Sequence, residues 1–94
     1  MNDLIQILKE HENDIKEDFS VKKIGIFGSQ IRGDSNDESD VDILVEFDKP
    51  TLHNFMGLIF YLEDLFSKKV DLVTEKSLSP YIKSTVEKEV VWCE

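Results

Sequence analysis

One stretch near the middle of the chain, residues 24–47, constrains the fold more than any other part of the sequence. Ile24–Phe27 is an apolar run of residues that favour β-strands, and it ends at Gly28-Ser29, a pair suited to a sharp turn. The next residues, Gln30–Gly33, are predicted to form one helical turn that begins at Ser29. Such a turn presents unpaired backbone N–H groups and the positive end of a helix dipole, which together favour the binding of a phosphate.

The second half of this stretch predicts another strand, because polar and apolar residues alternate from Asp40 to Phe47. The apolar face contains Val41, Ile43, Val45 and Phe47, and the other face contains Asp40, Asp42, Leu44 and Glu46. At a rise of roughly 3.3 Å per residue, the Cα atoms of Asp40 and Asp42 lie about 6.6 Å apart. Both carboxylates can therefore converge on one small cation.

A third acid, Asp71, lies in the predicted strand Lys69–Val73. If this strand pairs beside the one from Asp40 to Phe47, three carboxylates cluster on one face. Acids that alternate with Val and Ile are also typical of the solvent-exposed face of an ordinary strand, and Asp40 and Asp42 alone fit that simpler interpretation. Asp is nevertheless a poor strand former, so the combination of motifs favours a site.

Gly28-Ser29, ten intervening residues, Asp40-x-Asp42 and an Asp71 framed by apolar residues form a combination with a known counterpart. It resembles the nucleotidyltransferase superfamily of DNA polymerase β, and specifically the minimal nucleotidyltransferases that are paired with HEPN-domain toxins. The resemblance covers nearly the whole chain. It implies that the three acids are the catalytic residues and the Mg²⁺ ligands.

The same resemblance implies a nucleotide-binding turn made by Gly28, Ser29 and Arg32, with Gln30-Ile31 where many relatives have a basic and a small residue. It further implies an Mg²⁺-dependent protein adenylyltransferase that uses ATP and modifies a tyrosine hydroxyl of a partner HEPN toxin, acting as its antitoxin. Two alternatives stay open. One is transfer to a small molecule with the help of a second subunit, and the other is a non-catalytic antitoxin that masks its partner by binding.

The length and the net charge of the chain limit which functions it can have. The chain has 94 residues, which suits one nucleotidyltransferase domain over residues 1–94 and leaves no room for a second domain. Asp and Glu outnumber Lys and Arg by 20 to 11, and the net charge of −9 would repel nucleic acid. Cys93, His11 and His53 form no disulfide or zinc pattern. With no transmembrane-length or signal-like segment, we expect a soluble, cytoplasmic protein that does not bind membranes.

The flanking segments complete a prediction of secondary structure. The remaining predicted elements are a helix from Asn2 to Asp18, a strand from Val21 to Phe27, a polar loop over Gly33–Ser39, a helix capped by Thr51 and ending near Phe66, a helix starting at Ser79-Pro80, and a short strand or apolar tail at Val90–Trp92. The predicted fold is α/β: a small mixed sheet of the polymerase β-like palm type, with helices mainly on one face and its acidic face open.

The helix that ends near Phe66 is apolar over an unusually wide arc. Its predicted core stripe contains Leu52, Phe55, Met56, Ile59, Leu62 and Phe66. Leu58, Tyr61 and Leu65 widen that stripe sideways. Either this helix is buried on two sides, or Leu58, Tyr61 and Leu65 contact another chain in a homodimer or a hetero-oligomer.

Overall fold

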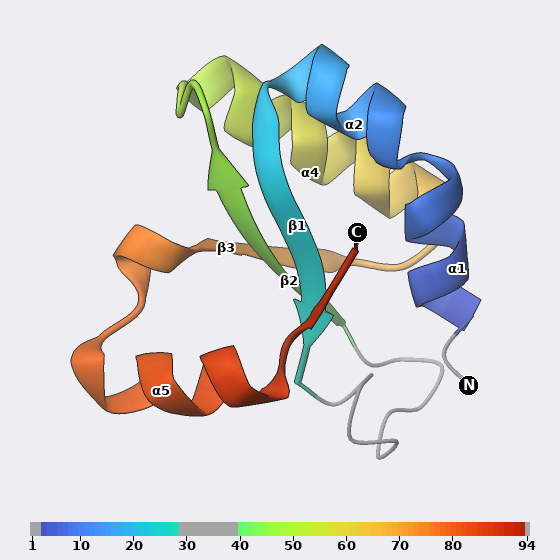
Figure 1. Cartoon of the computed structure of the whole chain (residues 1–94). Helices are drawn as coiled ribbons and strands as arrows, with labels where there is room; N and C mark the ends of the chain where they lie inside the picture. Colours follow the sequence, from blue (N-terminus) through green and yellow to red (C-terminus); the bar gives the residue numbers. More distant parts are fainter. Residues whose placement is uncertain (1–2, 29–39, 94) are drawn as a thin grey trace.

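The order of helices and strands in the computed structural model, which describes residues 3–28 and 40–93, follows the predicted order (Figure 1). The helices are α1 (Asp3–Glu10), α2 (Glu12–Phe19), α4 (Leu52–Phe66) and α5 (Pro80–Glu89), and the 3₁₀ turn η1 is Glu75–Ser77. The strands are β1 (Val21–Phe27), β2 (Val41–Phe47), β3 (Val70–Thr74) and β4 (Val91–Trp92). Within the described ranges, no helix is long and apolar enough to cross a membrane.

The strands form a mixed sheet with the order β3-β2-β1-β4. β1 is antiparallel to both β2 and β4, whereas β2 and β3 are parallel. The core lies on one face of this sheet, where the apolar residues of β2 and β3 pack with Leu58, Leu62 and Phe66 of α4. This confirms the small α/β fold with a mixed sheet and helices mainly on one face.

The opposite face of the sheet is less open than predicted. Leu44 is fully buried there although it shares a strand face with Asp42, and it lies outside the main core cluster. Val86 of α5 is also buried and also lies outside that cluster. In Figure 1, α5 lies apart from α1, α2 and α4, and the chain returns from it into β4.

The predicted helix from Asn2 to Asp18 is two helices, separated at His11. Lys9 is in the last turn of α1 and Glu12 is in the first turn of α2, so each charge is next to the helix end that it stabilises. The break brings the His11 ring to Tyr61 of α4, with Nδ1 3.2 Å from the tyrosine Oη. His11 therefore has a specific partner, which the sequence alone did not indicate.

Helix α4 begins where predicted, since the Thr51 side chain accepts a hydrogen bond of 3.1 Å from the backbone N–H of Asn54. Its wide apolar arc is explained by burial on two sides. Leu58 is fully buried in the core, and Tyr61 packs against Phe19 of α2 with ring centroids 5.5 Å apart. Leu65 is also partly buried against the core.

Of the two alternatives for this arc, burial on two sides therefore accounts for Leu58, which cannot belong to a partner surface because it is fully buried. Tyr61 and Leu65 are partly buried against the core, and a partner contact through them stays a prediction. The predicted core stripe of α4 is also too long. It includes Leu52 and Met56, yet their side chains are 76% and 39% exposed. A helical periodicity shows which residues share a face, but not which neighbouring element that face meets.

Gly25 allows the end of the chain to lie against β1. A Cβ at this position would be 2.8 Å from both Val90 Cγ2 and the carbonyl oxygen of Val91. We expect Gly25→Ala to lower the free energy of unfolding by about 1–3 kcal/mol, because β4 would have to move away. Urea denaturation measures this loss. Gly57→Ala is the control, since its Cβ would meet only the Phe19 ring, and an equal loss in both variants would contradict the assignment.

The Cys93 thiol predicts a dependence of stability on alkaline pH. Burial, then the negative charge and hydrogen bond of Glu12, raise the pKa of Cys93 from 9.0 to about 11. Between these values the folded thiol keeps a proton that the unfolded thiol loses, so the free energy of unfolding should fall as pH rises from 9 to 11. Burial also raises the pKa of Tyr61, which acts in the same direction.

Denaturation of the wild type and of Cys93→Ala across this pH range isolates the contribution of the thiol. The curve of Cys93→Ala should be flatter than that of the wild type, whatever its overall stability. Parallel curves would show that the thiol contributes nothing to the alkaline loss.

Candidate active site

Asp42 and Asp71 lie side by side on the sheet. They are partners in the register between the parallel strands β2 and β3, so about 4.8 Å separates their strands. The residues on either side of each acid are buried in the core, namely Val41 and Ile43 for Asp42 and Val70 and Leu72 for Asp71. Both acids therefore point to the opposite face, Asp42 half-buried and Asp71 exposed.

The turn after β1 reaches the same place. Phe27 is the register partner of Asp42 on the other side of β2, and Gly28 follows it with φ +78°. A Cβ on Gly28 would collide with a carboxylate oxygen of Asp42. A side chain is excluded here both by the positive φ and by the carboxylate, so there are two independent reasons for a glycine at this position. Gly28, directly after β1, thus lies against Asp42 of β2, which is paired in register with Asp71 of β3.

The remaining predicted site residues are not gathered in this way. Asp40 is exposed immediately before β2. Ser29 and Arg32 lie outside the described residues, as does the predicted helical turn Gln30–Gly33. Within residues 3–28 and 40–93, no three His, Cys, Asp or Glu side chains form a group that could hold a metal ion. The described part of the site is a pair of carboxylates.

The carboxylate pair has the chemistry that a magnesium ion requires. Mg²⁺ binds oxygen ligands, usually one or two carboxylates together with water and substrate phosphates. Asp42 and Asp71 supply such oxygens from adjacent strands, and Gly28 leaves the Asp42 carboxylate room beside the turn. The donor set therefore fits Mg²⁺ with a phosphate-bearing substrate.

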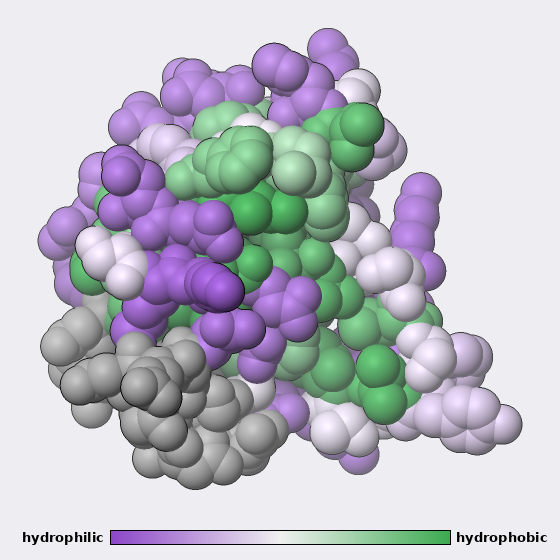
Figure 2. All heavy atoms as spheres, turned by 180° about the vertical axis from the view of Figure 1, so that it is seen from behind, coloured by the Kyte–Doolittle hydropathy of each residue, from purple (hydrophilic) through white to green (hydrophobic). Residues whose placement is uncertain are grey.

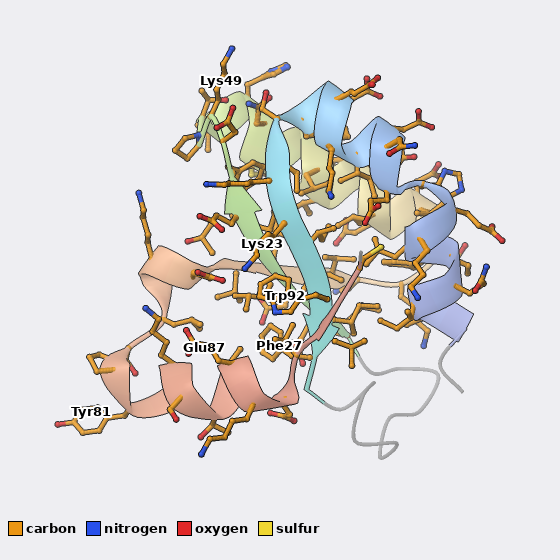
Figure 3. The ribbon with its side chains drawn as sticks, in the orientation of Figure 1. Lys23, Phe27, Lys49, Tyr81, Glu87 and Trp92 are labelled. Carbon is orange, nitrogen blue, oxygen red and sulfur yellow. The ribbon has the colours of Figure 1, made fainter. Side chains whose placement is uncertain are left out.

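Three further side chains on this face were missed by the sequence analysis. Lys23 and Phe27 alternate with the buried residues of β1, and Trp92 is opposite Gly25 in β4. The Lys23 ammonium group lies 4.8 Å from the centre of the Trp92 ring, and Figure 3 shows Phe27 next to that ring. A cation and two aromatic rings are the groups that contact phosphates and bases. Extending the strand alternation to β1 would have revealed Lys23 and Phe27.

Gly28→Ala should damage the site through two effects. The positive φ costs roughly 1–2 kcal/mol for a residue with a Cβ, and the new methyl group would push the Asp42 carboxylate away. We expect lower stability and weaker binding of Mg²⁺–ATP, measured by thermal unfolding and calorimetry. In the double variant Gly28→Ala/Asp42→Ala the collision is relieved, so the two stability losses should not add. Additive losses would mean that the two residues do not touch.

The sequence of this chain matches one family of known proteins over most of its length. The model of the nucleotidyltransferase domain family matches residues 8–93. The protein adenylyltransferase MntA of Thermococcus cleftensis is 44% identical over 93 residues, which cover 98% of this chain and 94% of that protein. A protein of Methanocaldococcus jannaschii to which protein adenylyltransferase activity is attributed is 40% identical over 96 residues, covering 98% and 96% of the two chains.

Solved structures show the same fold. A structure attributed to a minimal nucleotidyltransferase has a TM-score of 0.81 at 29% identity, covering 97% of this chain and 95% of that one. A toxin–antitoxin structure with AMP-PNP has a TM-score of 0.73 at 22% identity, covering 92% and 72%. An MNT antitoxin in complex with a tri-AMPylated HEPN toxin of Shewanella oneidensis has a TM-score of 0.66 at 20% identity, covering 96% and 71%.

Proposed function

Because this chain belongs to the nucleotidyltransferase domain family, we propose that it is an antitoxin that transfers AMP from ATP to a tyrosine hydroxyl of a HEPN-domain toxin. The observation that supports this most is the meeting of Gly28, Asp42 and Asp71 on one face of the sheet. The adenylyltransferase names of the relatives support AMP as the transferred group, and the complexes of similar fold support a HEPN toxin as the acceptor.

The proposed reaction is a displacement at the α-phosphorus of ATP. The tyrosine oxygen forms a bond to this phosphorus, the bond from it to the oxygen that bridges to the β-phosphorus breaks, and pyrophosphate leaves. In this proposal, backbone N–H groups at Gly28 and Ser29 hold the β- and γ-phosphates, and Arg32 contributes to nucleotide binding. A carboxylate oxygen of Asp71 takes the proton of the hydroxyl.

Asp40, Asp42 and Asp71 would hold Mg²⁺, which when bound neutralises charge on the phosphates and on the reacting oxygens. The acids also have a role of their own. Asp42 is fixed between Gly28 and Asp71, so it sets where the α-phosphate lies relative to the turn. Asp71 is more exposed than Asp42, so it can reach the acceptor.

Intact mass measurement of the HEPN protein after incubation with this chain tests the proposal. A mass increase of one or more AMP groups that requires ATP and Mg²⁺ is expected. The net charge of −9 also suits an antitoxin that only masks a basic RNA-binding surface, and masking needs neither ATP nor Mg²⁺. Neutralisation of the toxin without a mass change would favour masking.

Asp42→Asn should abolish AMP transfer, because it removes a charged ligand at the centre of the site. If Asp71 acts chiefly as the general base and only secondarily as an Mg²⁺ ligand, Asp71→Asn should keep Mg²⁺–ATP affinity but slow transfer by about 10²–10⁴-fold. Calorimetry and single-turnover transfer rates measure the two quantities. Asp48→Asn, an exposed acid just after β2, is the control and should transfer at the wild-type rate. A wild-type rate in Asp71→Asn would make Asp71 an ordinary solvent-facing residue.

A further inference from the structure

β3 is an edge strand of the sheet, and a hydrogen bond at its start shows which way its backbone groups point. The backbone N–H of Val41 donates to the carbonyl oxygen of Lys69 over 2.9 Å, so the Lys69 carbonyl points toward β2. The backbone groups of successive residues in a strand point alternately to its two sides. The residues of β3 that direct their N–H and C=O groups to the outer edge are therefore Val70, Leu72 and Thr74.

Side chains of this protein cap both ends of that outer edge. At the start of β3, a carboxylate oxygen of Glu63 accepts a hydrogen bond of 3.2 Å from the backbone N–H of Val70. At the end of β3, the Ser77 hydroxyl donates a hydrogen bond of 2.8 Å to the carbonyl oxygen of Thr74. Both caps agree with the direction assigned to the backbone groups, and caps of this kind limit where another strand can pair.

The middle of the edge, at Leu72, is open. Within residues 3–28 and 40–93, neither the N–H nor the C=O of Leu72 has a hydrogen-bond partner on the outer side. Leu72 also keeps 7% of its surface exposed, whereas Ile26 and Ile43 face the same core from the inner strands and are fully buried. This difference matches a free backbone edge. One donor and one acceptor on a single residue are the groups that pair with one residue of another strand.

The surroundings of this edge suit an extended peptide. β3 passes behind β1 in Figure 1, so it lies nearer the viewer in Figure 2. Apolar surface fills the middle of that second view, with hydrophilic side chains to the left of it. A peptide that adds to a sheet edge gains affinity from its main-chain hydrogen bonds, and its alternate side chains contact the surface beside the strand.

We propose that an extended segment of the acceptor protein pairs with the outer edge of β3 as an antiparallel strand, and that this pairing delivers the acceptor tyrosine to Asp71. The identity of the acceptor as a HEPN-domain protein rests on the proposed function. The residue opposite Leu72 exchanges two hydrogen bonds with it. The next residue of the segment is then opposite Asp71, and residues opposite each other in a sheet point to the same face. A tyrosine at that position lies on the acidic face.

The antiparallel arrangement also sets how close the tyrosine comes. Hydrogen-bonded pairs, about 5.5 Å apart at Cα, alternate with non-bonded pairs about 4.5 Å apart whose side chains are closer. Because the pair at Leu72 is hydrogen-bonded, the pair at Asp71 is the closer kind. The hydroxyl proton then passes to Asp71, the oxygen bonds to the α-phosphorus, and pyrophosphate leaves. Asp42 lies on the inner side of Asp71, which agrees with an acceptor that arrives from the outer side.

Amide hydrogen exchange followed by NMR tests the edge in this chain, alone and with the HEPN-domain protein, without ATP or Mg²⁺. In the free chain the N–H of Leu72 should exchange at least about tenfold faster than that of Asp71, which bonds to β2. In the complex the N–H groups of Leu72 and Thr74 should slow by about tenfold or more. A Leu72 N–H that is protected in the free chain, a complex without added protection, or no complex would each overturn the proposal.

Thr74→Pro tests the same edge through activity. Thr74 has φ −92°, near the range of proline, and its N–H points away from β2, so the ladder between β2 and β3 stays intact. Proline removes an outer N–H and its ring obstructs an added strand. We expect kcat/KM for AMP transfer to the HEPN-domain protein to fall by about tenfold or more, with Mg²⁺–ATP affinity unchanged.

Thr74→Val is the matched control, because it loses the hydroxyl but keeps the N–H, and it should transfer within about twofold of the wild type. Thermal unfolding establishes that Thr74→Pro is folded, and if it is not, hydrogen exchange in the wild type decides alone. Normal transfer by folded Thr74→Pro, or an equal loss in Thr74→Val, would contradict the proposal. A wild-type dimer that Thr74→Pro converts to a monomer in sedimentation would show that a second copy occupies the edge instead.

Asp42→Asn separates this proposal from the proposed function. In complex with the HEPN-domain protein it should protect the Leu72 N–H as the wild type does, although it transfers no AMP. If the wild type shows this protection but no transfer with ATP and Mg²⁺, the pairing at β3 stands and the proposed reaction fails. If the wild type transfers AMP without this protection, the reaction stands and the pairing fails.

Discussion

The register of β1, β2 and β3 is the constraint on which the rest of this structure depends. It aligns Phe27, Asp42 and Asp71 in one row across three strands and sets Gly28 against the Asp42 carboxylate. Side chains alternate along a strand, so a slip of one residue would turn the acids into the core and the buried residues of β2 into solvent. Burial of that apolar face therefore fixes the position of the acids on the other face.

The same alternation explains how so small a chain can contain a site of like charges. The main core is assembled almost entirely on the α4 side of the sheet, and little of the stability depends on the acidic face. Leu44 and Val86 are the exceptions among the described residues, because they bury the part of that face nearest to α5 and β4. This second, minor layer leaves Asp71 exposed, and on the same face the Lys23 ammonium group lies over the Trp92 ring.

The sequence correctly predicted the features that depend on residue patterns within a single segment. Strand alternation located β1 and β2, and Thr51 located the start of α4. Patterns within one segment could not show contacts between segments. His11, at the break between α1 and α2, contacts Tyr61 fifty residues away, and the burial of Leu58 depends on how α2 and the sheet enclose α4. The clash that requires Gly28 to lack a side chain is likewise visible only once β1 and β2 are paired.

Burial of α4 on two sides leaves only its outer side for contact with other molecules, and that side has its own apolar stripe. Leu52, Met56 and Phe60 form this stripe, and their side chains are 76%, 39% and 62% exposed. Asp42 and Asp71 point to the opposite face of the sheet, because the residues on either side of each acid are buried in the core below α4. A substitution in the stripe therefore leaves the carboxylate pair in place, whereas a change of strand register would displace the acids and the core together.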